Sequence, residues 1–139
     1  MIDEARTDEE ILATWAVMRQ LRTSMAPEDY LPTARRMMAD GFRLAALRDE
    51  AGVVRAVAGY RFFEMLYAGR ILYVDDLITD ETSRSRGHGK AMLDWLKAQA
   101  RSSGCAQLHL DSGVQREKAH RFYFREGMGV NAYHFRIEL

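Results

Sequence analysis

The chain has 139 residues, of which 47% are hydrophobic and 29% are charged, which predicts one soluble domain over residues 1–139 with a core of its own. Because 20 basic residues balance 20 acidic ones, the net charge gives no general attraction to nucleic acid or to an anionic membrane. The single Cys105 excludes an internal disulfide, and the lack of a membrane-length apolar run or a signal-like N-terminus favours a cytoplasmic protein.

Hydrophobic periodicity and turn residues predict an alternating series of helices and strands. Thr7 and Glu10 form a capping-box pattern that starts the first helix, whereas Pro27 and Pro32 predict a loop because proline lacks a backbone donor. The expected elements are a strand over 1–6, a helix over 7–24, a loop over 27–32, a helix over 33–40, strands over 42–48, 53–67 and 70–79, a helix over 89–103, a strand over 106–111, a helix over 117–126 and a strand over 131–139. This order predicts an α/β domain with a mixed sheet that contains a three-strand antiparallel meander.

A basic, glycine-containing loop connects the strand over residues 70–79 to the helix that follows it. Its pattern is R-x-x-G-x-G, from Arg84 to Gly89. The first N–H groups of a helix are unpaired and carry the positive end of its dipole, and glycine lets ligand oxygens approach the backbone, so this loop is predicted to bind phosphate. Neither the Walker pattern G-x-x-x-x-G-K-[ST] nor the Rossmann pattern G-x-G-x-x-G is present.

The loop resembles the pyrophosphate-binding loop of the GNAT superfamily of N-acetyltransferases, whose usual form is [QR]-x-x-G-x-[GA]. The segment from Ala119 to Gly127 is similar to the family's A-x-x-[LF]-Y-x-x-x-G signature, and residues 77–79 stand where its fourth strand ends in L-x-V. The order of elements is also similar over nearly the whole chain. The resemblance implies the acyl-CoA N-acyltransferase fold, with a mixed, mostly antiparallel sheet, two N-terminal helices, and helices on both faces.

The resemblance also implies acetyl-CoA as the co-substrate. The loop would hold the pyrophosphate, and the backbone of residues 77–79 would pair with the pantetheine arm like an added strand. Arg116 stands where many members carry an asparagine that helps to hold this arm, so it could instead reach a phosphate or point to solvent. The residues expected to bind the co-substrate are Leu77, Ile78, Thr79, Arg84, Ser85, Arg86, Gly87, His88, Gly89, Lys90 and Arg116.

Three residues are predicted to be catalytic. Tyr123 is the tyrosine of the second signature, and a phenol that stays protonated at neutral pH can protonate the CoA sulfur. Asp75 and Asp76 are candidate bases in an apolar strand; strand alternation predicts that they point to opposite faces, so that at most one lines the amine site. We rank Asp75 first as base and interpret Asp76 as structural or substrate-binding, with His109 and His134 as competing bases.

The predicted function is transfer of an acetyl group from acetyl-CoA to a primary amine of a small molecule or protein, by direct attack in a ternary complex. No base accompanies Cys105 in the sequence, so an acyl-enzyme is not expected. The alternative is a binding module that keeps the acyl-CoA loop without turnover and serves as a sensor or partner subunit. The scattered histidines show no metal-ligand spacing, and neither nucleic acid nor membrane is an expected partner. The sequence does not decide the identity of the amine acceptor, nor whether the protein forms a homodimer.

Overall fold

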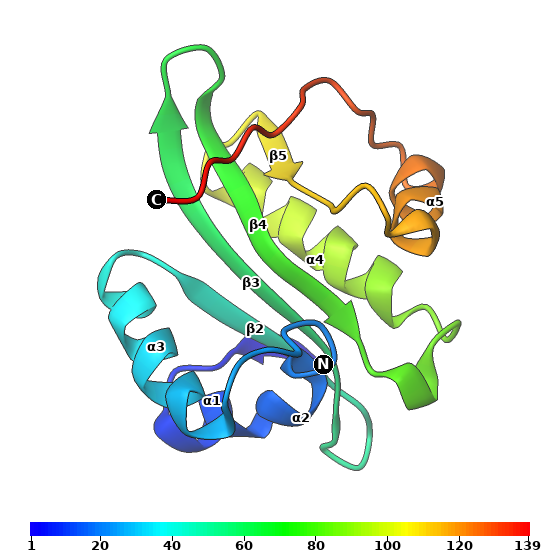
Figure 1. Ribbon diagram of the computed structural model, residues 1–139. Coiled ribbons are helices and arrows are strands. Elements are labelled where there is room, and N and C mark those ends of the chain that lie inside the picture. Colours follow the sequence, from blue (N-terminus) through cyan, green and yellow to red (C-terminus); the bar gives the residue numbers. More distant parts are fainter. The chain divides into compact units, whose positions relative to one another are not determined.

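Five strands form one sheet, in the order β1-β2-β3-β4-β5, in the computed structural model, which describes residues 1–139 (Figure 1). The strands are β1 (Ile2–Glu4), β2 (Arg43–Arg48), β3 (Val54–Met65), β4 (Gly69–Thr79) and β5 (Gln107–Leu110). Each of the first three pairs of neighbours is antiparallel. β5 lies beside β4 and points the same way, so the sheet is mixed, as the sequence predicts (Figure 1).

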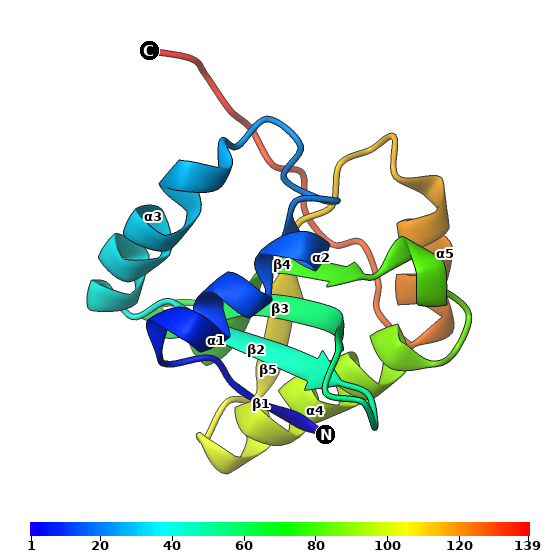
Figure 2. The same cartoon turned by 90° about the horizontal axis from the view of Figure 1, so that it is seen from below.

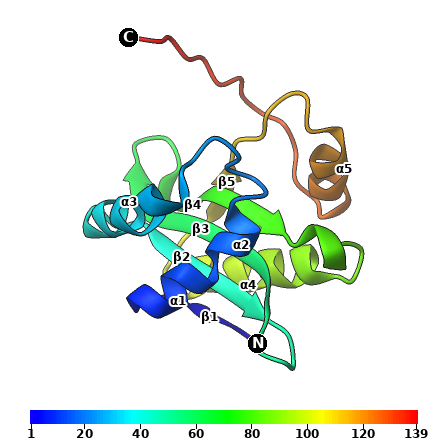
Figure 3. The same cartoon turned by 60° about the horizontal axis from the view of Figure 1, so that its bottom comes forward.

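The chain forms two compact units, residues 1–109 and residues 110–139. The helices are α1 (Asp8–Ala13), α2 (Trp15–Met18), α3 (Pro27–Ala39), α4 (His88–Ser102) and α5 (Glu117–Arg125), with a short 3-10 turn η1 (Glu81–Ser83). Within the first unit, α1, α2 and α3 cover one face of the sheet and α4 covers the other (Figures 2 and 3). The second unit contains α5. None of the helices combines the length and the apolar character that a bilayer span requires.

Apolar side chains fill both faces of the sheet in the first unit. On one face, Ile11 of α1 and Tyr30 of α3 belong to a buried cluster that includes Val57 of β3. On the other face, α4 buries three large side chains completely, and the ring of its Trp95 lies edge-on to the ring of Tyr60, with centroids 5.9 Å apart. The three fully buried residues of α4 are Met92, Leu93 and Leu96. Two packed faces fix the position of β4, which carries the candidate site.

The first predicted helix is correct at its start and wrong at its end. Thr7 and Glu10 form the predicted capping box. The helix is then interrupted at Thr14, and α2 ends at Met18 instead of continuing to residue 24. The buried Thr14 hydroxyl donates to the carbonyl of Ile11 at 2.6 Å and lies 2.6 Å from the Tyr30 hydroxyl. A threonine hydroxyl that bonds its own helix backbone competes with continuation of the helix.

The predicted loop over residues 27–32 is wrong, because α3 runs without a break from Pro27 to Ala39. Pro27 is the first helical residue, where the missing N–H has no helical partner to lose. Pro32 lies inside the helix and removes one internal hydrogen bond. Burial of Tyr30 and Ala34 against the sheet outweighs that loss. Gly41 follows the helix with φ +99°, a conformation that favours glycine at a helix end.

The predicted strand over residues 131–139 is also wrong, because these residues form no strand. Alternation of apolar and polar side chains is present, but a strand also needs a neighbour to accept and donate its backbone hydrogen bonds. The other predicted strands and the helices over residues 89–103 and 117–126 are confirmed to within a few residues at their ends.

Candidate active site

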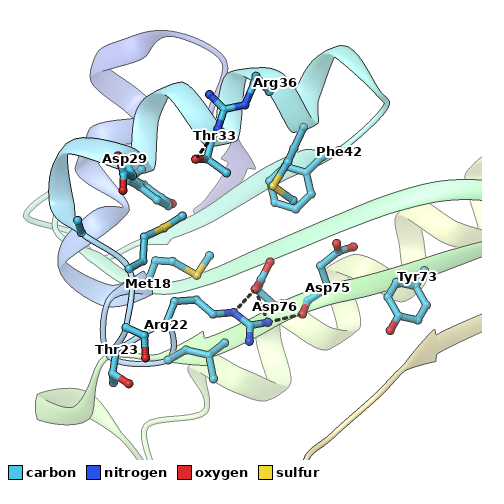
Figure 4. Close-up of a pocket in the computed structure, with 17 residues that line it drawn as sticks. Met18, Arg22, Thr23, Asp29, Thr33, Arg36, Phe42, Tyr73, Asp75 and Asp76 are labelled. Atoms are coloured by element: carbon cyan, nitrogen blue, oxygen red, sulfur yellow. Dashed lines mark hydrogen bonds and ion pairs between the residues drawn. The ribbon is translucent and has the colours of Figure 1, made fainter. Parts of the chain in front are cut away.

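A β-bulge in β4 shapes the candidate site. Val74 is paired with Tyr60 of β3, and Asp76 is paired with Gly59, so Asp75 is one extra residue on β4. Such a bulge breaks the alternation of side chains along a strand. The prediction that Asp75 and Asp76 point to opposite faces is therefore wrong, and both line one pocket (Figure 4).

Gly59 makes room for the carboxylate of Asp76. A Cβ atom at this position would lie 2.6 Å from two ring carbons of Phe42 and would overlap an oxygen of Asp76. Both of these side chains line the pocket. Glycine weakens a strand interior, but here it allows a close approach of side chains over the backbone.

The pocket lies between β4 and the segment from α2 to α3, with a volume of about 1050 Å³ (Figure 4). Much of its lining is soft and apolar, and methionine side chains adapt to ligands of different shape. Charged side chains of both signs also reach it. The lining residues are Met18, Leu21, Arg22, Thr23, Ser24, Met25, Ala26, Asp29, Tyr30, Thr33, Ala34, Arg36, Met37, Phe42, Tyr73, Asp75 and Asp76.

Asp76 is a mostly buried carboxylate with one basic partner. Its side chain is 10% exposed, and Arg22 places two nitrogens within 2.7 Å of Oδ1. Burial raises the pKa of Asp76 above its usual 3.8, although the nearby Arg22 guanidinium partly opposes this effect. The same guanidinium donates to the carbonyl of Asp75 at 2.9 Å (Figure 4). A buried acid with a raised pKa in a pocket is a candidate proton acceptor.

Asp75 has a different environment, because Arg61 of β3 holds it with two hydrogen bonds. The guanidinium Nε lies 3.0 Å from Oδ1, and Nη2 lies 2.6 Å from Oδ2. Arg61 also lies over the Phe42 ring, 5.5 Å from its centroid. A bidentate pair of this kind fixes the carboxylate and occupies both of its oxygens.

The predicted phosphate loop leads directly into α4. Gly87 precedes the first residue of the helix with φ +79°, and Ser85 has φ +68°, a conformation that side chains other than glycine rarely adopt. No side chain caps the N-terminus of α4. The N–H groups of the first turn, which includes Gly89 and Lys90, are thus left without a side-chain acceptor, as a phosphate site requires.

The loop carries two cations without a carboxylate partner. Arg84 and Arg86 are exposed and form no ion pair. Lys90 is paired with Asp94 at 2.9 Å. His88 lies 3.4 Å from the Ser83 hydroxyl through Nδ1. The two arginines are therefore the loop cations that are available to an anionic ligand.

Asp80 fixes the polypeptide at the start of this loop. It accepts hydrogen bonds from Gln20 at 3.1 Å, from Arg55 at 2.9 Å and from the Thr82 hydroxyl at 2.8 Å. Burial alone would raise the pKa of Asp80, but these donors lower it to about 2. On the preceding strand end, residues 77–79 pair with residues 56–58 of β3. The loop therefore begins at a strand end that is held both by its pairing with β3 and by the hydrogen bonds of Asp80.

In the unit of residues 110–139, Tyr123 is buried on α5. Burial raises the pKa of the Tyr123 phenol, and a hydrogen bond with Arg116 partly opposes that shift. Arg116 itself precedes the first residue of α5. The position where the family commonly has an asparagine thus carries a guanidinium next to the predicted acid.

The competing candidates have ordinary structural partners. His109 Nε2 lies 2.7 Å from the side-chain oxygen of Gln107, and His134 Nδ1 lies 3.3 Å from Asp111. Cys105 is buried and free. No group of three or more His, Cys, Asp or Glu side chains is placed to hold a metal ion.

The sequence model of the acetyltransferase (GNAT) family matches this chain over residues 12–129. The protein belongs to the GNAT family. An uncharacterized GNAT relative from Bacillus subtilis (strain 168), the N-acetyltransferase YhdJ, is 34% identical over 130 residues, or 92% of this chain and 91% of that protein. The aminoalkylphosphonate N-acetyltransferase of Salmonella typhimurium is 31% identical over 96 residues, which are 69% of this chain and 60% of that enzyme.

A solved structure with the GNAT fold supports the same architecture. The aminoglycoside N-acetyltransferase in complex with CoA superposes with a TM-score of 0.83 at 13% identity, over 100% of this chain and 95% of that one. The predicted fold class is confirmed, and so is the predicted enzyme class, an N-acetyltransferase that uses an acyl-CoA donor.

Several residues of this GNAT site are not evident from the sequence. Arg61 could have been found, because the turn at residues 68–69 sets a hairpin register that brings it close to Asp75. Arg22 could not, because it reaches Asp76 from a segment without a repeating pattern. No local pattern indicates the role of Gly59, because the bulge opposite it depends on the register of two strands.

Proposed function

We propose that this GNAT enzyme transfers an acetyl group from acetyl-CoA to the primary amine of a small molecule, by direct attack of the amine in a ternary complex. The observation that carries the proposal is Asp76, a buried carboxylate with a raised pKa in the wall of a pocket of about 1050 Å³. A pocket of this size accommodates a small metabolite, since typical ligand sites enclose roughly 300–1,000 Å³.

We assign the role of base to Asp76 rather than to Asp75. An acceptor amine enters as an ammonium ion, and its nitrogen attacks the thioester carbonyl only after it has lost a proton. Asp76 has a raised pKa and one basic partner, whereas both oxygens of Asp75 are held by Arg61. Asp76 therefore takes the proton, directly or through a water, and Asp75 orients the guanidinium beside it.

Tyr123 supplies the proton for the leaving group. When the amide bond forms and the C–S bond breaks, the electron pair passes to sulfur, and a phenol can protonate the resulting thiolate. Burial raises the pKa of Tyr123, which keeps the phenol protonated at neutral pH. Arg116 stabilises the phenolate that remains until the proton is replaced.

The phosphate loop holds the donor. The uncapped N-terminus of α4 and the unpaired Arg84 and Arg86 fit a pyrophosphate, because both supply donors and positive charge without competing carboxylates. Backbone groups of residues 77–79 would hold the pantetheine arm, and Arg116 would contribute to this arm or to a phosphate.

The acceptor is proposed to carry an anionic group as well as its amine. Arg36 lines the pocket from α3, and its only partner is the Thr33 hydroxyl at 3.1 Å (Figure 4). A guanidinium without a carboxylate partner can bind a carboxylate or phosphonate with two hydrogen bonds. The relative from Salmonella typhimurium is named for aminoalkylphosphonates, which combine these two groups.

The decisive experiment measures release of CoA thiol with aminoalkylphosphonates, amino acids, aminoglycosides, polyamines, peptides and neutral alkylamines. We expect turnover to be highest with an amine that carries an acidic group. Arg36→Gln should lower kcat/KM for that acceptor by about 10–100-fold, which corresponds to 1.4–2.7 kcal/mol, and should leave a neutral amine unchanged. Arg35→Gln is the matched control, because Arg35 is paired with Asp8 and does not line the pocket.

Two results would contradict the proposal. Binding of CoA without turnover over the whole panel would support a sensor or partner subunit instead. Tyr123→Phe should reduce turnover at least 100-fold with little change in CoA affinity, whereas Tyr133→Phe, at an exposed position, should not. Equal turnover of the Tyr123→Phe variant and the wild type would remove Tyr123 from its role.

A further inference from the structure

Arg22 is the basic partner of the proposed base, and it reaches Asp76 from outside the sheet. It lies in the irregular segment between α2 and α3, and its side chain is 50% exposed, whereas that of Asp76 is 10% exposed. Its Nη2 lies 2.6 Å and its Nε 2.7 Å from one carboxylate oxygen, Oδ1 (Figure 4). Nη2 also donates to the carbonyl of Asp75 at 2.9 Å, so the guanidinium ties the carboxylate to the strand backbone.

Arg61, the basic partner of Asp75, is held by more of its surroundings. It projects from β3, its side chain is 29% exposed, and its guanidinium lies over the ring of Phe42. No aromatic ring lies against the guanidinium of Arg22 in this way. An ion pair made by a long, exposed side chain contributes little, because one geometry has to be kept at the expense of side-chain entropy. Of the two arginines, Arg22 is therefore the one that a ligand can replace.

An acceptor competes with this guanidinium for one carboxylate. An ammonium ion gives its proton to Asp76, directly or through a water, only if it can approach the carboxylate. A guanidinium stays protonated at physiological pH, so Arg22 cannot take that proton itself, and its charge repels a second cation beside it. We propose that Arg22 is a positioning residue that holds Asp76 in the free enzyme and is displaced from it by the ammonium group of the acceptor.

This inference rests on the proposed function, in which Asp76 is the base. The exchange replaces one cation by another, so a positive charge stays beside the carboxylate throughout. A mostly buried charge that loses its partner is strongly destabilising, and the exchange avoids such a state. Until the acceptor arrives, the three hydrogen bonds of Arg22 keep the carboxylate ionised and fixed against the strand.

Several other groups influence the charge of Asp76. The titratable groups that line the pocket with it or act on it are Arg22, Asp75 and Tyr73 from its own strand, Arg61 from β3, and Asp29, Tyr30 and Arg36 from α3. Burial raises the pKa of Asp76 most, and Asp75 adds to this effect; Arg22 opposes it more strongly than Arg61 does. Removal of the Arg22 guanidinium should therefore raise the pKa of Asp76 further.

Nuclear magnetic resonance of the free protein tests the pairing without an acceptor. The carboxyl carbon signal of Asp76, assigned with Asp76→Asn, is followed through a pH titration. Its pKa should rise in Arg22→Gln and return towards the wild-type value in Arg22→Lys. Arg19→Gln is the matched control and should leave the pKa unchanged, because Arg19 is exposed in the same stretch but does not line the pocket. An unchanged pKa in Arg22→Gln, with folding checked by circular dichroism, would overturn the proposal.

Addition of an amine tests the displacement. The Nε–H signal of Arg22, assigned with Arg22→Gln, should move when aminomethylphosphonate or ethylamine is added to the CoA-bound protein. At mildly alkaline pH, the Kd of aminomethylphosphonate should be about 3–10-fold lower in Arg22→Gln, because the amine no longer competes with a guanidinium, and Arg22→Lys should restore it. A purely structural role for Arg22 predicts the opposite, a higher Kd once its support of Asp76 is lost.

The outcomes separate this inference from the proposed function. An Arg22 signal that neither amine moves, or a Kd that rises in Arg22→Gln, would overturn the displacement. Turnover of these amines while the Arg22 signal stays in place would leave the proposed function intact and remove only the inference. Movement of Arg22 without turnover of any amine would support the displacement and contradict the proposed function.

Discussion

Replacement of Gly59 by alanine should damage stability and catalysis together. The added Cβ would lie 2.6 Å from two carbons of the Phe42 ring and would overlap the carboxylate of Asp76. Overpacking of this kind lowers the free energy of unfolding by about 2–3 kcal/mol, whereas alanine in place of glycine in a strand raises it by about 0.5–1 kcal/mol. The net destabilisation is thus about 1–2 kcal/mol.

This cost can be expressed as a melting temperature. An unfolding entropy of about 2.1 cal/mol/K per residue gives roughly 290 cal/mol/K for 139 residues, so the Gly59→Ala variant should melt about 3–7 °C below the wild type. Displacement of Asp76 by on the order of 1 Å should also lower kcat/KM by about 100-fold. Calorimetry and thiol release measure the two effects.

The control is Gly129→Ala, because no atom lies within 4 Å of a Cβ atom built at Gly129. It should keep the melting temperature and the activity of the wild type. If Gly59→Ala melts within 1 °C of the wild type and retains kcat/KM within twofold, then Asp76 and Phe42 do not pack closely against Gly59.

Four further outcomes are expected. Burial raises the pKa of Asp76 above 3.8, so kcat/KM should fall as the pH decreases through that pKa, and Asp76→Asn should remove this acidic limb of the pH profile. The raised pKa also means that the charged carboxylate costs folding free energy at neutral pH, so Asp76→Asn should lose activity with little loss of stability. Asp80 has the opposite shift: its stabilisation is present above about pH 4 and is lost as the pH falls towards 2, and Asp80→Asn should destabilise the protein by roughly 1.5–3 kcal/mol in urea unfolding at pH 7. Gly87→Val should raise the Kd for CoA at least tenfold in calorimetric titrations. Gly52→Val is the control: Gly52 has a similar φ of +81° in the β2–β3 turn, so valine there should impose the same backbone strain without lowering the affinity for CoA.

Local signals predicted the elements whose partners are near in sequence. The capping box at Thr7, the hairpins of β2, β3 and β4, and the glycine ends of α3, α4 and α5 all depend on residues within a few positions of one another. The prediction was wrong where a distant contact decides the outcome. Pro32 is tolerated in α3 because the helix buries Tyr30 and Ala34. That burial cannot be predicted from the local sequence pattern.

The candidate site shows the same division. The loop from Arg84 to Gly89 can be predicted as a phosphate site from the sequence, because such a site depends on backbone conformation and on a helix that follows directly. The sequence predicts both aspartates as site residues, but their orientation depends on one unpaired residue in β4. A bulge is a property of two strands in register, so a strictly alternating pattern cannot reveal it.

The pocket draws its two kinds of lining from different parts of the chain. Asp75 and Asp76 come from a sheet strand that is held on both faces, whereas most of the remaining lining comes from residues 18–42. Within that stretch, Arg22 is paired with Asp76 and Phe42 packs over Gly59, so these two residues have to be kept. Exchanging the other pocket residues of the stretch between relatives is thus a practical route to new acceptor preferences while the two aspartates stay in place.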